Sequence, residues 1–401
     1  MIEYADALSL ITARARPLSA ETVPLAESLG RILAADVRAG EAIPPFDRAA
    51  MDGYAVRSAD TRPAGAREPV ELDVIEDRPA GRSSRKVVGP GQAVRIMTGA
   101  PMPKGADAVV MVENTAKAGR KVVIRTAADP GDHIGPAGED VAKADLVLEK
   151  GRPLGPAELG MLAAVGRATV RVARRPLLAV VSTGDEIVEP GERRGPGKIR
   201  NANGYALSAL AARSGAAAVY LGIARDDPAS LRRALKKAGP ADLLVLSGGV
   251  SVGDYDLVRN ELVAAGVRPV FWQVRIKPGK PTFFGTRGRQ LVFGLPGNPT
   301  SALVMFHLFV RPAIDIALGR TEIGPRRGRA VLEREIILKP GRAQFLRAVL
   351  GDEGPSLRVD PFPDQRSGVL RSMVRSRALI AVPPGAERLK AGETVDILHL
   401  E

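Results

Sequence analysis

Polar, glycine-rich turns follow short apolar segments between Leu177 and Pro299, and they carry residue types that bind charged ligands. These turns are residues 182–186, 225–227, 247–256, 277–281 and 295–299. In an open α/β sheet, the loops after the strands meet at the carboxyl edge, where ligands bind in a crevice. We therefore expect their carboxylates, lysines and backbone amides to converge, a composition that suits a phosphorylated ligand with a divalent cation.

Two of the turns are suited to an oxyanion. Lys277 and Lys280 flank a rigid Pro-Gly pair, and two ammonium groups held close together are unfavourable unless an anion lies between them. Asn298 and Pro299 are good N-cap and N1 residues, so a helix N-terminus should present unpaired amides to the crevice. The plainer alternatives are two solvated lysines and a well-capped structural turn.

The remaining turns supply glycines and acids. After Ser247, the paired Gly248 and Gly249 let backbone amides approach a ligand, although a structural tight turn fits them equally well. Asp254 and Asp256 follow, and two carboxylates at a strand edge could hold magnesium or orient a ligand hydroxyl. Glu186 and Asp226 belong to the same expected edge, where each acid taken alone is more often a cap or a surface carboxylate.

An alternation of strand and helix patterns must position these turns. Strands are expected at 177–181, 217–223, 243–246, 270–274 and 290–293, and helices at 203–214, 228–238, 257–265 and 299–317. Such alternation implies a parallel sheet with right-handed crossovers. Pro312 should kink or break the last helix.

The flanking regions have a different pattern. Residues 3–14 read as an amphipathic helix, and residues 46–141 as a β-rich domain without convincing helices. Beyond Gly324 the chain is again strand-like, with expected strands at 331–338, 345–350, 369–373, 378–382 and 394–398.

Composition narrows the possible functions. The 401 residues include no cysteine and three dispersed histidines, which argues against disulfides, thiolate nucleophiles and histidine-based metal sites. The net charge of +13 comes from arginines spread along the chain, and aromatics are only 4%, so a polyanionic small molecule is favoured over nucleic acid. No apolar run of membrane-spanning length and no signal-like start was found, so we expect a soluble cytoplasmic protein. Walker and dinucleotide fingerprints are absent.

Seven motifs, in order, resemble those of the molybdopterin molybdenumtransferase family, which includes bacterial MoeA and the E domain of gephyrin. They are FDRAAMDGYAV at 46–56, RIMTGA at 95–100, GED at 138–140, STGDE at 182–186, SGGVSVGD at 247–254, KPGKP at 277–281 and GLPGNP at 294–299. The resemblance covers essentially the whole chain.

The resemblance implies an α/β multidomain fold in four parts. An elongated dimerisation segment would comprise residues 1–45 and 142–172, with an inserted β-rich domain at 46–141. A central parallel α/β domain of the molybdopterin-binding type would span 173–321, and a β-barrel-like domain 322–401. It also implies a homodimer in which the second subunit completes the crevice.

The activity implied is the insertion of molybdate into adenylylated molybdopterin, with magnesium-dependent release of AMP. Other proteins of molybdenum cofactor biosynthesis are implied as partners. The residues carried over fall into two sets. The catalytic set is Asp52, Thr98, Asp140, Glu186, Asp226 and Asp256, of which the last three would also serve magnesium. The set binding molybdopterin or molybdate is Ser247, Gly248, Gly249, Lys277, Lys280, Pro296, Gly297, Asn298, Ser301, Arg347 and Ser367.

The sequence departs from the family pattern at one position, and two alternative functions remain open. Gly135 stands where the family often has an arginine, which affects how the 133–140 loop makes its contacts. The alternative activities are adenylylation of molybdopterin by the same kind of α/β domain, and a non-catalytic scaffold of the same fold.

Overall fold

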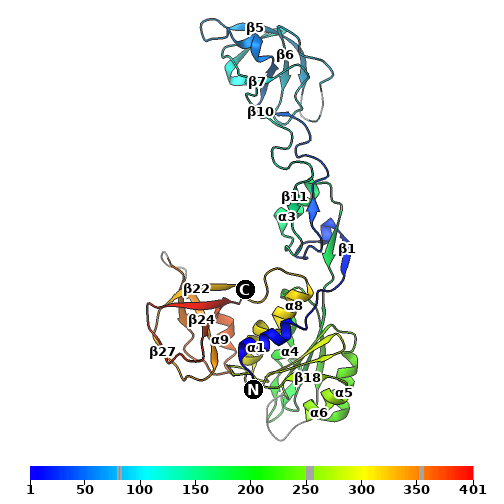
Figure 1. Ribbon diagram of the computed structural model, residues 1–401, viewed down its shortest axis with the longest axis vertical. Coiled ribbons are helices and arrows are strands. Elements are labelled where there is room, and N and C mark those ends of the chain that lie inside the picture. Colours follow the sequence, from blue (N-terminus) through cyan, green and yellow to red (C-terminus); the bar gives the residue numbers. More distant parts are fainter. Residues whose placement is uncertain (79–80, 82–83, 250–256, 352–355, 401) are drawn as a thin grey trace.

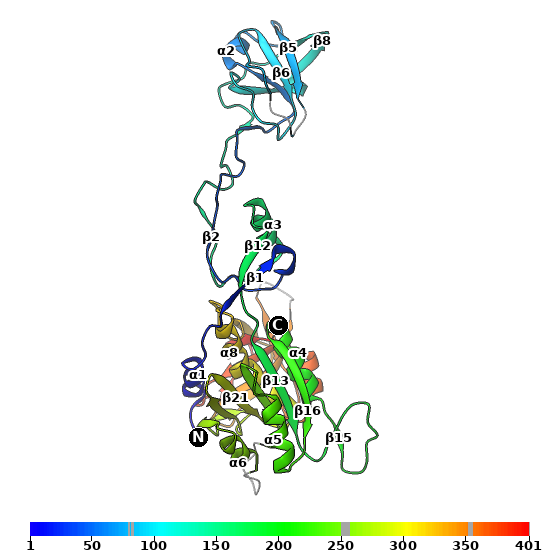
Figure 2. The ribbon, with the colours of Figure 1, turned by 90° about the vertical axis from the view of Figure 1, so that its right-hand side faces the viewer.

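The chain is elongated, with a β-rich domain at one end and an α/β domain beside a barrel at the other (Figure 1). This computed structural model describes residues 1–78, 81, 84–249, 257–351 and 356–400. A narrow middle region, in which the outgoing and returning chain run side by side, joins the two ends (Figures 1 and 2). The β-rich domain is therefore inserted between two halves of the middle region.

Short antiparallel pairs hold the two passes of the chain together in the middle region. Strand β1 (Ala20–Pro24) pairs with β12 (Thr169–Ala173), and β2 (Val37–Arg38) pairs with β11 (Leu146–Leu148). Helix α3 (Pro156–Ala164) and the 3-10 turn η1 (Leu25–Glu27) complete it. A small apolar cluster that includes Leu33, Leu154 and Leu162 forms its core.

The β-rich domain is a six-stranded sheet in the order β7-β4-β6-β5-β9-β8. Its strands are β4 (Gly53–Val56), β5 (Val70–Arg78), β6 (Gln92–Ile96), β7 (Ala108–Met111), β8 (Thr115–Ala118) and β9 (Lys121–Ile124). The pair β3 (Arg48–Ala49) and β10 (Ile134–Gly135) closes its base. One short helix, α2 (Ser58–Thr61), and the 3-10 turn η2 (Val112–Asn114) lie within it, so the domain is β-rich as expected.

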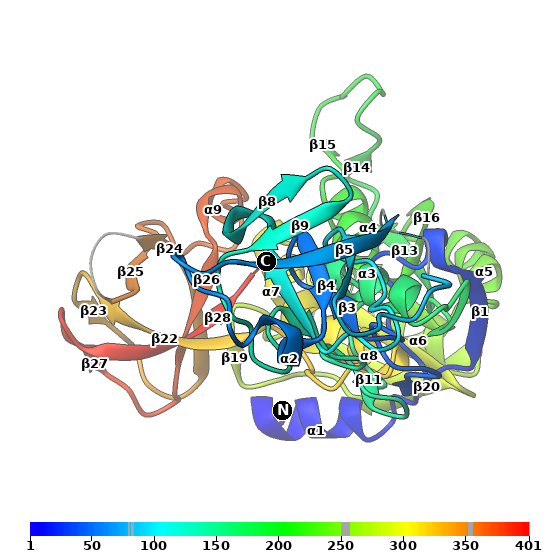
Figure 3. The same ribbon diagram turned by 90° about the horizontal axis from the view of Figure 1, so that it is seen from above.

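The α/β domain contains a six-stranded sheet in the order β16-β13-β17-β21-β20-β18. Its strands are β13 (Leu177–Thr183), β16 (Ala217–Ala224), β17 (Leu243–Ser247), β18 (Arg268–Phe271), β20 (Phe283–Arg287) and β21 (Gln290–Leu295). Its helices include α4 (Asn203–Arg213), α5 (Pro228–Lys237) and α6 (Leu257–Ala264). A small parallel pair, β14 (Ile187–Val188) and β15 (Ile199–Arg200), lies at the ends of a loop that projects from the domain (Figures 2 and 3).

Alternating side chains bury both faces of this sheet. Leu178 and Val180 pack with α4, with α1 (Tyr4–Thr12) and with the helix that begins at Pro299. Ala179 and Val181 pack with α5 and α6 on the other face. Because strands buried on both faces need apolar residues at every position, the uniformly apolar run beginning at Leu177 is explained.

The sheet is not entirely parallel. Strands β16, β13, β17 and β21 are parallel, but β20 runs antiparallel to β21 and to β18. Strand β20 was not expected from the sequence; it forms a hairpin with β21 through the two-residue turn Gly288–Arg289. Gly288 has φ +58°, and hairpin turns of this length favour glycine for that reason.

The long apolar helix contains a π-helical turn. It runs as α7 (Pro299–Met305), the π-turn η3 (Phe306–Val310) and α8 (Arg311–Ala317). The π-turn lies just before Pro312, which has no backbone N–H to donate to the preceding turn. The backbone hydrogen bonds there change from the α to the π pattern, and the helix continues. By length and composition Pro299–Ala317 could cross a membrane, contrary to the expectation that no apolar run is long enough, but 83% of the apolar stretch is buried within the protein.

The C-terminal part forms a closed barrel. Strands β24-β25-β22-β28-β26 are joined in that order, and β26 also pairs with β24. The strands are β22 (Arg327–Leu332), β24 (Ala343–Gly351), β25 (Arg358–Pro361), β26 (Ala378–Val382) and β28 (Thr394–His399). The short strand β19 (Ile276–Lys277) pairs with β24. Strands β23 (Ile336–Ile337) and β27 (Arg388–Leu389) form a separate antiparallel pair. The expected α/β, β-rich and barrel-like parts are thereby confirmed.

One expected strand of this region is wrong. Residues 369–373 lead into helix α9 (Arg371–Arg375) instead of a strand. Met373 packs against the main core, and the Ser372 hydroxyl donates to the Val369 carbonyl at 2.6 Å. The Ser376 amide donates to the Ser372 carbonyl at 3.0 Å, which is a helical bond over four residues, so this segment closes a helical turn.

Candidate active site

The carboxyl ends of the four parallel strands meet at one edge of the sheet. In the strand register, Ser182 of β13 lies opposite Ser247 of β17, and Ser247 lies opposite Leu295 of β21. The turns that follow these strands are therefore neighbours. Two adjoining cavities lie among them.

The first, which we call the polar cavity, has a volume of about 360 Å³. Its walls include the expected residues Glu186, Gly248, Gly249, Pro296, Gly297 and Asn298. The second, which we call the basic cavity, has a volume of about 800 Å³. Its walls include the expected residues Lys277, Lys280, Pro296, Asn298, Ser301 and Ser367. Pro281, Pro296 and Asn298 line both, so the two cavities are adjacent parts of one crevice.

Asn203, the first residue of α4, organises the polar cavity. Its amide nitrogen donates to the Ser247 hydroxyl and to the Gly297 carbonyl, both at 2.8 Å. These bonds join the end of β17 to the turn after β21. Ser247 itself is buried behind the cavity wall, and the Asn203 Oδ1 is buried with no hydrogen-bond donor among the described residues.

Backbone shape requires the two glycines of the polar cavity. Gly248 has φ +99° and Gly249 has φ +67°. A Cβ atom at Gly248 would lie 2.5 Å from the Thr183 carbonyl oxygen, and one at Gly249 would lie 2.6 Å from Val258 Cγ2. Since side chains are excluded here, the backbone itself forms the wall.

Three cations of the basic cavity lack carboxylate partners. Lys277 and Lys280 are exposed, and neither they nor Arg342 form an ion pair with any residue in the described ranges. Cations clustered in a concave site create a positive potential that attracts anions. Arg366, in contrast, is bound to Asp364 at 2.6 Å, and this pair lowers the pKa of the Asp364 carboxyl to about 2.

The N-terminus of the helix starting at Pro299 is joined to the barrel. The side chain of Asn298 does not cap the helix. Its Nδ2 atom donates instead to the Ser367 hydroxyl at 3.0 Å. The Thr300 backbone amide donates to the Ser367 carbonyl at 3.2 Å. The expected open N-terminus is therefore partly occupied by the chain itself, and Ser367 links the α/β domain to the barrel.

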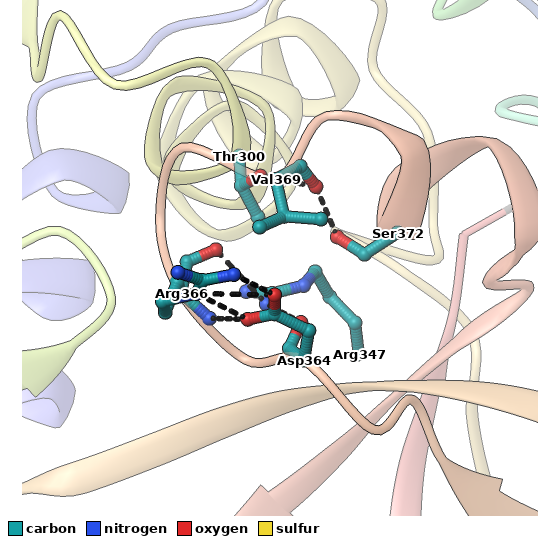
Figure 4. Close-up of polar contacts among 6 residues, drawn as sticks. All are labelled: Thr300, Arg347, Asp364, Arg366, Val369 and Ser372. Atoms are coloured by element: carbon teal, nitrogen blue, oxygen red, sulfur yellow. Dashed lines mark hydrogen bonds and ion pairs between the residues drawn. The ribbon is translucent and has the colours of Figure 1, made fainter.

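Arg347 lies behind the basic cavity and does not line it. It is fully buried, and its guanidinium donates to the carbonyls of Asp364 at 2.8 Å and Arg366 at 3.3 Å (Figure 4). Burial lowers the pKa of Arg347. In this structure its position supports the loop that carries Arg366 and Ser367.

The acids of the edge include a pair that was only partly expected. The Asp185 amide donates to the Asp226 carboxylate at 3.2 Å, and the Asp226 amide donates back to Asp185 Oδ1 at 3.3 Å. Glu186 lines the polar cavity next to them. Two neighbouring carboxylates suit magnesium, which binds protein through one or two carboxylates and retains waters. Asp256 lies outside the described residues, and among those described no group of three histidine or acidic side chains is set to hold a metal.

In sequence, Asp52 directly precedes β4, Thr98 follows β6 and Asp140 follows β10. The β-rich domain that contains these strands lies at the opposite end of the molecule from the α/β domain (Figure 1). The Thr98 amide and hydroxyl each donate to Asp52 Oδ1 at 2.7 Å. These bonds lower the pKa of Asp52. A single chain does not bring these three residues to the two cavities.

The structure also accounts for the departure at Gly135. Gly135 lies opposite Arg48 in the β3–β10 pair, and Arg48 forms an ion pair with Glu139 at 3.3 Å. A Cβ atom at Gly135 would lie 2.8 Å from Glu139 Oε2 and 3.3 Å from Arg48 Nε. The Arg48–Glu139 pair thus occupies the space next to this glycine.

Several cavity residues were not identified from sequence. They are Arg200, Asn201, Asn203 and Arg342. Asn201 and Asn203 could have been identified from sequence, because they lie at the start of an expected helix, where asparagine side chains often bond the backbone of a neighbouring turn. Nothing in the local sequence distinguishes Arg342 from the many other arginines.

Comparison with known proteins agrees with this architecture. Residues 2–166 match the MoeA N-terminal region (domain I and II), residues 179–315 a probable molybdopterin binding domain, and residues 329–400 the MoeA C-terminal region (domain IV). A crystal structure of a molybdopterin biosynthesis MoeA protein from Pyrococcus horikoshii is similar with a TM-score of 0.88 and 36% identity, covering 100% of this chain and 99% of that one.

Curated relatives match over nearly their full length. Molybdopterin molybdenumtransferase 2 of Mycobacterium tuberculosis is 39% identical over 385 residues, which is 94% of this chain and 95% of the relative. Molybdopterin molybdenumtransferase of Staphylococcus aureus is 35% identical over 401 residues, covering 100% and 96%. The chain therefore belongs to the MoeA family, as the order of its motifs indicated.

Proposed function

We propose that this protein is a molybdopterin molybdenumtransferase, which inserts molybdate into adenylylated molybdopterin and releases AMP. The observation that carries the proposal is the pair of adjoining cavities. One is walled mainly by backbone and polar side chains, with Glu186 and Arg200 as the charged residues among its described lining. The other contains Lys277, Lys280 and Arg342, three cations without carboxylate partners among the described residues. A pterin with a phosphate tail and a tetrahedral oxyanion require two such neighbouring sites. The curated relatives carry the same activity in their names.

The basic cavity is the proposed molybdate site. Lys277 and Lys280 would neutralise the doubly charged anion, with Ser301 and Ser367 orienting its oxygens. Charge-assisted hydrogen bonds to such groups contribute roughly 1.5 to 3 kcal/mol each. Arg342 is added to the site because it lines the same cavity. Arg347 is assigned a positioning role, since its donors are used by the loop that carries Ser367.

The polar cavity is the proposed pterin site. Gly248, Gly249 and Gly297 offer backbone groups, and Ser247 and Asn203 fix the two turns that carry them. Pro296 and Asn298 would contact both substrates, because they line both cavities. The sulfur atoms that receive molybdenum belong to the substrate, which fits a chain with no cysteine.

Magnesium is proposed to be held by Asp226 with Asp185, and by Glu186 and Asp256 in the wider acidic group. When bound, it would neutralise charge on the phosphate oxygens of the adenylate. The chain's own part is to hold the 184–187 loop in place. Lys198 Nζ donates to the Asp185 carbonyl at 2.6 Å, and an Arg225 Nη1 donates to the Ile187 carbonyl at 3.0 Å.

We further propose a homodimer in which Asp52, Thr98 and Asp140 complete the crevice of the partner chain. The distance of the β-rich domain from the crevice of its own chain supports this arrangement (Figure 1). The same proposal divides the chain into four parts, which are residues 1–45 with 142–172, 46–141, 173–321 and 322–401. It also includes partners from molybdenum cofactor biosynthesis and a location in the cytoplasm.

A two-substrate assay tests the activity. The purified protein is given adenylylated molybdopterin with molybdate and magnesium, and separately molybdopterin with ATP and magnesium. AMP release together with molybdenum-loaded pterin in the first reaction, and no adenylylated product in the second, is the expected result. Adenylylation in the second reaction would assign the alternative activity. Normal molybdoenzyme activity in a strain lacking the gene would favour a scaffold.

A further inference from the structure

A third cavity lies at the opposite edge of the α/β sheet from the crevice. It has a volume of about 1020 Å³ and is lined by Leu243 and Leu291, which are at or next to the first residues of the parallel strands β17 and β21. The connector between α1 and β1 forms another wall, where the Leu18 amide donates to the Ala317 carbonyl at 2.9 Å. We call this hollow the amino-edge cavity. It is separate from the candidate active site.

Five arginines line the amino-edge cavity, and only one of them has a carboxylate partner there. They are Arg14, Arg16, Arg174, Arg287 and Arg289. Arg174 is bound through two nitrogens to Asp242, at 2.8 and 3.1 Å, and Asp242 also accepts the Leu177 amide. Asp242 is the only acid among the described residues that line the cavity, so these residues carry a net charge of four positive units.

The other four guanidiniums have neutral partners or none. Arg14 donates to the Leu10 carbonyl, Arg16 to the Ala13 and Ala15 carbonyls, and Arg287 to the Leu235 carbonyl and the Gln290 side chain. Arg289 makes no hydrogen bond or ion pair within the described part of the chain. Each guanidinium has five N–H donors, so most of them remain available to a ligand.

Burial adds to the cost of this uncompensated charge. Arg287 is half-buried, and desolvation lowers its pKa. The tight Gly288–Arg289 turn of the β20–β21 hairpin fixes Arg289 next to it. Cations in a concave, partly desolvated site focus a positive potential, and an anion would relieve it.

We propose that the amino-edge cavity binds a compact, multiply charged phosphate-type oxyanion, of which pyrophosphate is the representative. Arginine matches phosphate oxygens through paired N–H donors. The described residues of the lining include no aromatic side chain on which a nucleobase could stack, so the site recognises the charged phosphate groups alone. Residues 17–19, which connect α1 to β1, form one wall of the cavity. A bound anion would therefore link the α/β domain to this connector, which leads to the middle region.

Isothermal titration with pyrophosphate at low salt tests the proposal on the full-length protein. The crevice is removed from the measurement by using Lys277→Ala/Lys280→Ala as the background. In this background Arg14→Gln/Arg289→Gln should weaken pyrophosphate binding by about tenfold or more for each arginine removed. Both are exposed side chains, so the variant avoids the structural contacts of Arg174 and Arg287.

The matched control removes two exposed arginines of the β-rich domain, Arg67→Gln/Arg120→Gln, and should leave pyrophosphate binding unchanged. Equal weakening in both variants, or no binding in the background protein, would overturn the proposal. Hydrogen exchange should also slow at residues 13–19 when pyrophosphate is bound. AMP should bind no more tightly than inorganic phosphate; much tighter binding of AMP would contradict recognition of phosphate alone.

Discussion

The two cavities of the crevice are adjacent, but they are built in different ways. In the polar cavity the organising side chains are buried and bonded to each other, as Asn203 is to Ser247 and to the Gly297 carbonyl. In the basic cavity the lysines are exposed and have no described carboxylate partner. The first therefore depends on backbone shape, whereas the second depends on charge.

This difference predicts how the stability and the activity of the protein should respond to substitutions in each cavity. A substitution in the polar cavity should damage folding and activity together, because the same bonds hold the sheet edge. A lysine substitution in the basic cavity should damage activity alone, because an exposed side chain without an ion pair contributes little to stability. Measuring stability and turnover on the same variants separates the two.

The largest effect is expected from Lys277→Ala/Lys280→Ala. Each lysine removed should weaken oxyanion binding about tenfold or more, so molybdate-dependent product formation should fall roughly a hundredfold or more at limiting molybdate. The thermal unfolding midpoint should stay unchanged. Lys237→Ala, an exposed lysine at the end of α5, is the control. Turnover like that of the wild type would remove the lysines from the site.

Gly248→Ala should show the opposite behaviour. The added methyl group would sit at φ +99° and 2.5 Å from the Thr183 carbonyl oxygen, so we expect a loss of roughly 2 kcal/mol or more in the free energy of unfolding. Chemical denaturation measures this loss. Gly195→Ala, where a Cβ meets nothing within 4 Å, should be neutral. Equal stability of the two variants would contradict a shape-dependent polar cavity.

The helix that begins in the crevice provides a pH response independent of both cavities. Burial, aided by Arg311 and Arg213, lowers the pKa of His307 to about 3. Between that value and its ordinary pKa near 6.5, the unfolded chain binds a proton that the folded chain does not. Stability should therefore fall as the pH falls through this range, by about 1.4 kcal/mol per pH unit from this residue.

His307→Met should flatten that slope, and His133→Gln should keep it. Unfolding free energies measured from pH 7 to 4 give the comparison. The slope should also survive in Lys277→Ala, since the lysine is exposed. A slope unchanged by His307→Met would show that other groups produce the acid response.

The smallest effect tests the contribution of the β-rich domain. Asp52→Ala and Lys277→Ala/Lys280→Ala should each have little activity, but co-expression should restore activity if the crevice is shared between subunits. With random pairing in a two-fold dimer, about a quarter of the sites are intact, so about a quarter of wild-type turnover is expected. Co-expressed Asp52→Ala and Thr98→Ala lie on the same side of the proposed crevice and should not complement. Restoration in that control pair, or none in the first, would argue against a shared site.

Sequence patterns predicted the sheet edge well because parallel strands buried on both faces give long apolar runs. The run starting at Leu177 and the glycine pair after Ser247 both lie where the pattern indicated. The hairpin strand Phe283–Arg287 was missed because its turn is only two residues long. Residues 369–373 were read as a strand because a short apolar segment does not distinguish helix from strand.

Side-chain pairing across distant segments was less accessible from sequence. Nothing local indicates that Asn298 would bond Ser367 instead of capping its own helix, or that Asp185 would face Asp226. Arg347 matched a family pattern, yet its burial depends on the closure of the barrel around it. Such contacts are set by how the α/β domain and the barrel pack together.

Anomalous diffraction from crystals soaked with molybdate and magnesium tests the central claim most directly. We expect one strong molybdenum peak in the basic cavity, within contact distance of Lys277 and Lys280 and next to Ser301 or Ser367. That peak should disappear in Lys277→Ala/Lys280→Ala crystals. A molybdenum peak confined to another part of the chain, with the basic cavity empty, would contradict the account.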